Sequence, residues 1–251
     1  MNEQLSRTRL LLGQTGIEKL RAARVAVFGV GGVGGYTVEA LARSGVGALD
    51  LIDDDQVCLS NLNRQIIALH STIGQYKVDV AAARIHDIDP EITVRTYKTF
   101  YTPETAGQFD FTQYDYVVDA IDTVTGKLAL VMQAQAAGVP ILCCMGAGNK
   151  LDPTQLEVAD IYETSVCPLA RVMRNECRKR GVKHLKVVYS REPALTPIPD
   201  PEAPDGGTPA DATRPGGPRR ATPGSTAFVP SVAGLILAGE VIKDLAEYKR
   251  K

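Results

Sequence analysis

A glycine cluster directly follows a short apolar stretch near the start of this chain. Residues 25–30 are apolar and rich in valine, and Gly29, Gly31, Gly32 and Gly34 lie in the turn after them. A strand that enters a glycine turn and continues into a helix is typical of a nucleotide-binding βαβ unit. Glycine is needed there because a phosphate group approaches the bare backbone, and the following helix offers unpaired N–H groups to the anion. The turn alone leaves three alternatives open: NAD, ATP, or no ligand.

Composition excludes several other classes of protein. The chain has 251 residues, 44% hydrophobic and 23% charged, with a net charge of −1, which is ordinary for a globular protein. Any contact with nucleic acid must therefore come from a local basic patch. The five cysteines form no C-x-x-C pair, so a structural zinc site or a disulfide framework is not expected. Residues 1–12 lack the apolar core of a signal peptide, and residues 227–239 are too short to span a bilayer. We expect a soluble, cytoplasmic protein with no membrane contact.

Hydrophobic patterning predicts strands that alternate with helices. Strands are expected at residues 25–30, 48–52, 92–98, 116–120 and 140–144, and helices at 5–23, 36–44, 77–88 and 128–137. This alternation predicts an α/β fold with a doubly wound, Rossmann-like, mostly parallel sheet. Ligands of such sheets bind at the carboxyl ends of the strands.

The C-terminal part has a different pattern. We predict strands at residues 158–162 and 186–189, a basic helix at 168–180 and a C-terminal helix at 227–247. Residues 197–223 hold eight of the fifteen prolines, so a mobile loop rich in proline and glycine is expected there. We interpret residues 1–251 as one domain, with a nucleotide-binding core at 1–150 and a substrate-contacting part at 151–251.

A second motif, at residues 53–65, separates ATP from NAD. Asp53 ends the predicted strand 48–52 and is placed to bind ribose hydroxyls. Asn61, Arg64 and Lys77 add polar and cationic groups suited to a triphosphate. Asp122 follows the predicted strand 116–120 and is a candidate Mg²⁺ ligand. Each residue also has a simpler interpretation, as a surface charge for Arg64 and Lys77 and as a helix N-cap for Asp122.

The two motifs together resemble the ubiquitin-activating, adenylate-forming superfamily over residues 10–148. Its members activate a carboxylate by attack on the α-phosphate of ATP, which gives an acyl-adenylate and pyrophosphate. The resemblance implies that Asp53 binds ribose, that Asn61, Arg64 and Lys77 contact the phosphates, and that Asp122 binds Mg²⁺. Asp55, in the same motif, is a further candidate for cofactor binding. The resemblance also implies a homodimer in which an N-terminal arginine, Arg9 or else Arg7, reaches the partner's site.

Further segments resemble the tRNA threonylcarbamoyladenosine dehydratases, at residues 147–154, 158–161, 167–171 and 223–225. That family uses ATP to cyclise the threonylcarbamoyl group beside the tRNA anticodon into a hydantoin. The resemblance implies a tRNA carrying threonylcarbamoyladenosine as the substrate, with sulfur-relay or helper proteins as further candidates. The alternative is adenylation of the C-terminal glycine of a ubiquitin-like sulfur-carrier protein, although those enzymes usually carry C-x-x-C pairs. A third alternative is a nucleotide-binding scaffold without turnover.

The remaining candidate residues are basic side chains and cysteines. The tRNA could meet a basic stretch made of Arg171, Arg174, Arg178, Lys179, Arg180, Lys183 and Lys186, or Arg219 and Arg220. A solvated helix face is the alternative. Cys167, near the start of the basic helix, is the candidate acyl acceptor for a thioester, and a buried small residue is its alternative. Cys143 and Cys144 are predicted packing residues, and a monovalent cation site near residues 146–149 stays open.

Overall fold

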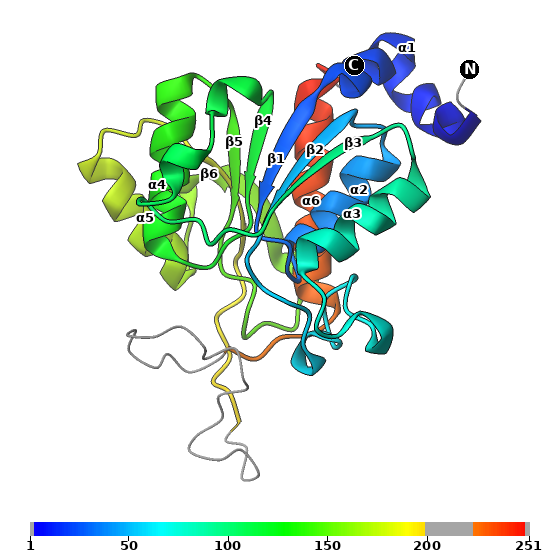
Figure 1. The fold of residues 1–251 in the computed structure, drawn as a ribbon. Coiled ribbons are helices and arrows are strands. Elements are labelled where there is room, and N and C mark those ends of the chain that lie inside the picture. Colours follow the sequence, from blue (N-terminus) through cyan, green and yellow to red (C-terminus); the bar gives the residue numbers. More distant parts are fainter. Residues whose placement is uncertain (1–2, 199–222, 249–251) are drawn as a thin grey trace.

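The computed structural model describes residues 3–198 and 223–248. Within them, one seven-stranded sheet has the order β3-β2-β1-β4-β5-β7-β6 (Figure 1). The strands are β1 (Arg24–Phe28), β2 (Ala48–Ile52), β3 (Thr93–Tyr97), β4 (Tyr116–Asp119), β5 (Ile141–Cys144), β6 (Leu156–Asp160) and β7 (Lys186–Ser190). Only β6, at one edge, runs antiparallel to its neighbour. The predicted α/β fold with a mostly parallel sheet is confirmed.

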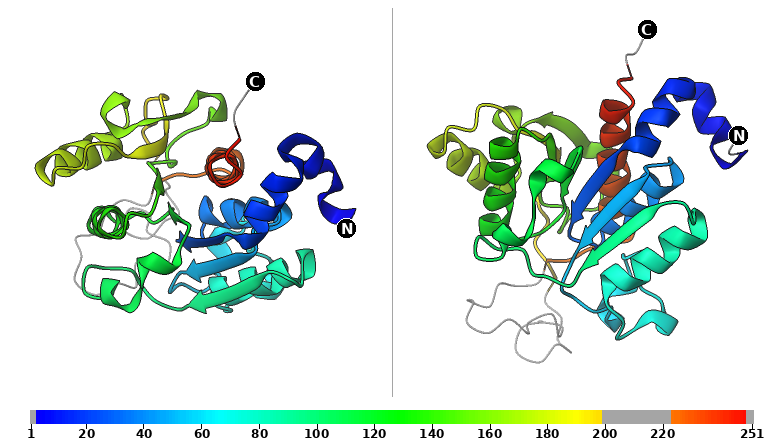
Figure 2. Two further views of the ribbon diagram at one scale, coloured as in Figure 1. Left: turned by 90° about the horizontal axis from the view of Figure 1, so that it is seen from above. Right: turned by 45° about the horizontal axis from the view of Figure 1, so that its top comes forward.

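The described residues form six α-helices, and five of them, α2 to α6, pack on the two faces of this sheet. The six helices are α1 (Ser6–Ala22), α2 (Gly34–Arg43), α3 (Lys77–Ile88), α4 (Val124–Ala137), α5 (Pro168–Lys179) and α6 (Phe228–Leu245). Figure 2 shows α4 and α6 end-on, on opposite sides of the sheet. Helices α2, α3 and α6 share one core with the sheet, and α4 and α5 cover the other face.

The alternation of side chains along β1 explains the two layers. Val25 and Val27 pack with α2, α3 and α6, whereas Ala26 and Phe28 pack with α4 and the aromatic segment 101–114. All four side chains are inaccessible to solvent. A parallel strand covered on both faces needs such a continuous apolar run. The glycine turn after β1 is therefore fixed to a rigid, fully buried strand.

Two helices differ from the prediction. Helix α4 begins at Val124 rather than at residue 128. Its first turn contains Gly126, a poor helix former, and a Cβ at this position would lie 2.7 Å from Ile121 Cδ1. Close packing thus favours glycine at this position. Because glycine is a poor helix former, the sequence pattern placed the start of the helix too late. Helix α1 is interrupted at Gly13, where φ is +74°.

Other predicted features lie elsewhere. The predicted strand 158–162 is found at residues 156–160, and a short 3₁₀ helix follows it. The predicted mobile loop 197–223 falls, apart from its end residues, outside the described residues, as do Arg219 and Arg220. Among the helices of the described residues, none combines the length and apolar character that crossing a membrane requires.

Candidate functional site

The glycine turn between β1 and α2 contains two kinds of glycine. Gly29 has φ +90°, and a Cβ there would lie 2.6 Å from Ala120 O. A Cβ at Gly34 would lie 1.8 Å from Gly29 O, so packing within the chain requires both glycines. At Gly31, however, a Cβ would meet only Gln65 Nε2, at 3.8 Å. Packing does not explain the glycine at that position, whereas the approach of a ligand to bare backbone does.

Asp53 connects the end of β2 to this turn. Its Oδ2 accepts a hydrogen bond from Val30 N at 2.7 Å, and its Oδ1 accepts one from Asp55 N at 2.9 Å. Burial raises the pKa of Asp53, although the Lys77 charge and the two N–H donors oppose that shift. The structure thus places a nearly buried carboxylate beside the open glycine backbone.

Lys77, at the start of α3, returns to the same edge of the sheet. Its Nζ lies 2.7 Å from Asp55 Oδ2 and 4.0 Å from Asp53 Oδ1. The Lys77 side chain is only 6% exposed, whereas that of Asp55 is 48% exposed. A buried cation whose main partner is half in water is suited to bind a second anion.

Asn61 and Arg64 lie in the segment between β2 and α3. Asn61 is 1% exposed, and its Oδ1 accepts a hydrogen bond from Cys58 N at 3.2 Å. Its side chain therefore has a structural contact that the sequence did not reveal. Arg64 Nη1 donates to Ser60 O at 2.8 Å and to Asn63 Oδ1 at 2.9 Å. The Arg64 side chain also borders the glycine turn, since a Cβ at Gly32 would lie 3.4 Å from Arg64 Cγ.

Gln65 is a residue of this site that sequence reasoning did not assign. It is 7% exposed, and its Oε1 has no hydrogen-bond partner among the described residues. Its Nε2 is the atom nearest to the open position at Gly31. A buried amide oxygen without a partner, in a side chain next to bare backbone, indicates a group that could face a ligand. The neighbouring Arg64 in the same motif was the only signal in the sequence.

The end of β4 carries two aspartates with different environments. Asp122, the predicted Mg²⁺ ligand, is exposed in the loop after the strand. Asp119, which was not predicted, is inaccessible to solvent and accepts hydrogen bonds from Lys127 Nζ at 3.0 and 3.1 Å. Lys127 Nζ also donates to Cys144 O at 2.6 Å. Burial is the strongest single influence and disfavours the Lys127 ammonium, but the charge and hydrogen bond of Asp119, together with the neighbouring Cys143 and Cys144, outweigh it and raise the pKa of Lys127. This pair joins the ends of β4 and β5 behind the site.

The cysteines are mostly buried. Cys167 is 3% exposed and is the N-cap residue of α5, and a Cβ at Gly146 would lie 3.8 Å from its Sγ. The predicted packing role of Cys143 and Cys144 is confirmed, because both are buried in β5. Burial raises the pKa of Cys144 to about 12 and that of Cys177 to about 11. These two thiols are therefore poor nucleophiles at neutral pH.

Arg9 does not meet the other site residues within its own chain. It lies on α1, which leads into the amino end of β1, whereas the glycine turn follows the carboxyl end (Figure 1). Arg9 lines a shallow hollow together with Leu5, Ile17 and Arg21. Arg7 is exposed on the same helix.

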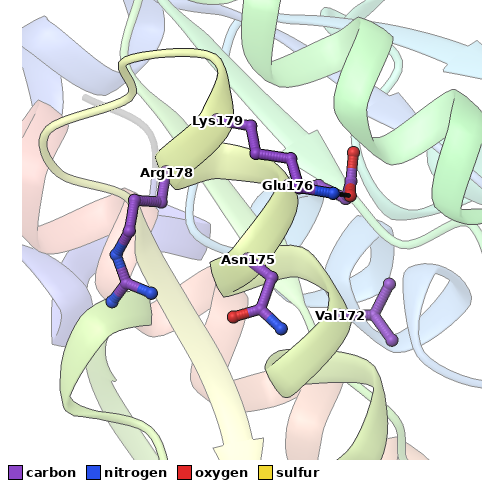
Figure 3. Close-up of a pocket in the computed structure, with 5 residues that line it drawn as sticks. All are labelled: Val172, Asn175, Glu176, Arg178 and Lys179. Atoms are coloured by element: carbon purple, nitrogen blue, oxygen red, sulfur yellow. Dashed lines mark hydrogen bonds and ion pairs between the residues drawn. The ribbon is translucent and has the colours of Figure 1, made fainter.

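Four side chains of the basic stretch make contacts with their own neighbours. Arg174 donates to Thr164 O at 2.6 Å, Lys179 and Arg180 pair with Glu176, and Lys186 pairs with Glu240 and Asp244. Arg171, Arg178 and Lys183 are exposed. Figure 3 shows that Arg178 and Lys179 leave α5 in different directions. The stretch therefore keeps an excess of positive charge, and Arg174 and Lys186 are the members most engaged in contacts within the fold.

Comparison with known proteins identifies the family of this chain. A model of the ThiF family matches residues 3–251, and the chain belongs to that family. It is 46% identical over 246 residues to the tRNA threonylcarbamoyladenosine dehydratase of Bacillus subtilis (strain 168), covering 98% of this chain and 95% of the relative.

A solved structure and a more distant relative complete the comparison. The crystal structure of the E. coli tRNA N6-threonylcarbamoyladenosine dehydratase in complex with ATP matches with a TM-score of 0.84 and 31% identity, covering 98% of this chain and 94% of that chain. The adenylyltransferase and sulfurtransferase uba4 of Aspergillus clavatus is 37% identical over 131 residues, which is 52% of this chain and 26% of the relative. The likeness to the dehydratases thus extends over the C-terminal part, and the likeness to the sulfurtransferase covers about half of the chain.

Proposed function

We propose that this chain is an ATP-dependent dehydratase that cyclises threonylcarbamoyladenosine in tRNA through an acyl-adenylate. The proposal rests on three features that lie together at the carboxyl ends of the strands. They are the open backbone at Gly31, the nearly buried Asp53 carboxylate, and the Lys77 and Arg64 cations. Near full-length similarity to two dehydratases supports the choice of substrate.

Each polar residue has a role in binding ATP. Asp53 accepts hydrogen bonds from the ribose hydroxyls, and the glycine turn receives the phosphates at the start of α2. Asn61, Arg64 and Lys77 contact the phosphate oxygens. When the nucleotide binds, Lys77 exchanges its ion pair with Asp55 for a contact with the phosphates. Asp122 is the proposed Mg²⁺ ligand, because one exposed carboxylate plus phosphate oxygens is a donor set that Mg²⁺ prefers.

The chemistry needs activation and positioning. A threonyl carboxylate oxygen attacks the α-phosphorus, the bond to the bridging oxygen breaks, and pyrophosphate leaves. The ureido nitrogen then attacks the acyl carbon, loses its proton and expels AMP, which closes the ring with net loss of water. The second step is intramolecular and gains from high effective molarity. The Arg64 and Lys77 charges stabilise the α-phosphate as negative charge develops on it.

Two further parts of the proposal concern the partner subunit and the acyl group. Arg9 cannot serve the site of its own chain, so we assign it to the site of the partner in a cytoplasmic homodimer. A thioester at Cys167 is the alternative to direct ring closure from the adenylate. The burial of Cys167 favours direct closure, and a Cys167→Ser enzyme with full activity would remove the thioester route.

The first experiment measures AMP and pyrophosphate release from ATP with purified tRNA that carries threonylcarbamoyladenosine. The control is the same tRNA without the modification. We expect release only with the modified tRNA, and a nucleoside lighter by one water. Release with neither tRNA, but with a ubiquitin-like partner protein, would favour the sulfur-carrier alternative. ATP binding without any release would favour a scaffold.

A further inference from the structure

The Asn63 side chain joins Arg64 to a segment far away in the sequence. Asn63 Oδ1 accepts a hydrogen bond from Arg64 Nη1 at 2.9 Å, and Asn63 Nδ2 donates to Ser225 O at 3.0 Å. Arg64 has only donors and Ser225 O only accepts, so one orientation of the amide satisfies both contacts. No other type of side chain of this length offers an acceptor and a donor in this arrangement. Asn63 thus forms a bridge between the nucleotide-binding segment and the start of the C-terminal segment.

The far end of this bridge is held by Asn149. Gly224 N donates to Asn149 Oδ1 at 2.6 Å, and Asn149 N donates to Gly224 O at 2.7 Å. The C=O group of Asn149 also accepts a hydrogen bond from Leu195 N at 2.8 Å. Asn149 has φ +57°, a conformation that asparagine tolerates better than most residues. Residue 224 therefore has a fixed position next to Ser225, whose carbonyl orients Asn63.

We propose that Asn63 is a positioning residue that makes the orientation of Arg64 depend on Asn149. The proposal rests on the phosphate-binding role of Arg64 given above. Arg64 is partly exposed and its long side chain has many rotamers in water. Its two acceptors, Ser60 O and Asn63 Oδ1, restrict that freedom before the nucleotide arrives. Nucleotide affinity thus depends on Asn149 and on the segment of Gly224 and Ser225, none of which contacts Arg64 directly.

The test compares the affinity of variants of the full chain for an ATP analogue with a methylene group between the α- and β-phosphates. Calorimetry without tRNA measures the dissociation constant. Arg64→Ala removes the charge, and we expect about a 30-fold loss of affinity. Asn63→Ala removes the bridge from an exposed position, so the fold is kept, and a loss of about threefold to tenfold is expected.

Asn149 supplies the decisive pair of variants. Asn149→Gly keeps the backbone conformation but removes the bond to Gly224 N, whereas Asn149→Asp keeps an acceptor there and is the matched control. We expect Asn149→Gly to weaken binding about threefold, Asn149→Asp to bind as the wild type does, and Asn149→Gly to have no further effect once Asn63 is alanine.

Two outcomes would overturn the proposal. One is wild-type affinity in Asn63→Ala or in Asn149→Gly. The other is that Asn149→Gly weakens binding of the analogue equally in the wild type and in the Asn63→Ala background. That result would show that Asn149 acts on the fold and not through Asn63. If Arg64→Ala itself binds the analogue normally, the phosphate-binding role of Arg64 fails instead, so the two failures are distinguishable.

Discussion

Two lysine–aspartate pairs lie at the carboxyl ends of β2 and β4, the strands on either side of β1, and have opposite environments. Lys127 and Asp119 are both inaccessible, and Lys127 Nζ is surrounded by both Asp119 oxygens and Cys144 O. Lys77 is nearly as buried, but its partner Asp55 is 48% exposed. A lysine whose donors are all used can only support the fold, whereas one paired with a half-solvated carboxylate can exchange that partner for a ligand. Burial of a charge alone therefore does not identify a functional residue.

Removal of Lys127 should give the largest effect on stability. Lys127→Met leaves a buried Asp119 carboxylate and Cys144 O without their donor, so we expect a loss of about 3–5 kcal/mol in the free energy of unfolding. Urea denaturation measures it. The double variant with Asp119→Leu removes the unpaired charge and should recover part of that loss. A single variant within about 1 kcal/mol of wild type would contradict the structural role of this pair.

Removal of Lys77 should separate function from stability. We expect Lys77→Met to lower the free energy of unfolding by less than Lys127→Met does, because its nearer partner Asp55 is half in water and only the more distant Asp53 loses a neighbouring charge inside the protein. The rate of AMP formation should fall about 100-fold, since a cation at the phosphates is lost. Lys98→Met is the matched control, because Lys98 pairs with the half-exposed Asp79 at 2.8 Å. Equal effects of the two variants on activity would refute the distinction between the pairs.

The same distinction applies to the basic residues near α5. Arg174 is held by Thr164, so Arg174→Glu should lower the stability of the protein. Arg171 and Arg178 are exposed, and we expect their double change to glutamate to weaken tRNA binding while ATP binding stays the same. The slope of log affinity against log salt should decrease by about one for each lost phosphate contact. Filter binding at several salt concentrations measures this, and an unchanged tRNA affinity would exclude this face.

The sequence predicted the positions of strands and helices better than it predicted the contacts of the polar side chains. The bounds of β2 and α3 match the prediction, because an apolar run ended by aspartates and a helix ended before Asp89-Pro90 are local signals. The pairing of Asp119 with Lys127 was missed, since both lie in apolar segments and no local pattern relates their charges. The bond between Asn63 and Ser225 joins residues 162 positions apart. Such contacts depend on how the elements pack.

The smallest predicted effect is a dependence of the free energy of unfolding on pH that comes from Asp53. Burial raises the pKa of Asp53 above its ordinary value of 3.8, although Lys77 and two N–H donors oppose the shift. The folded protein therefore binds this proton more tightly than the unfolded chain does, and stability falls as the pH rises from about the ordinary value through the raised one. We expect Asp53→Asn to remove that decline, and to weaken ATP binding because the ribose loses its carboxylate. Urea denaturation of wild type and variant between about pH 3.5 and 7 measures the difference in slope. Parallel stability curves would mean that the Lys77 charge and the two N–H donors fully offset the burial of Asp53, and would refute this prediction.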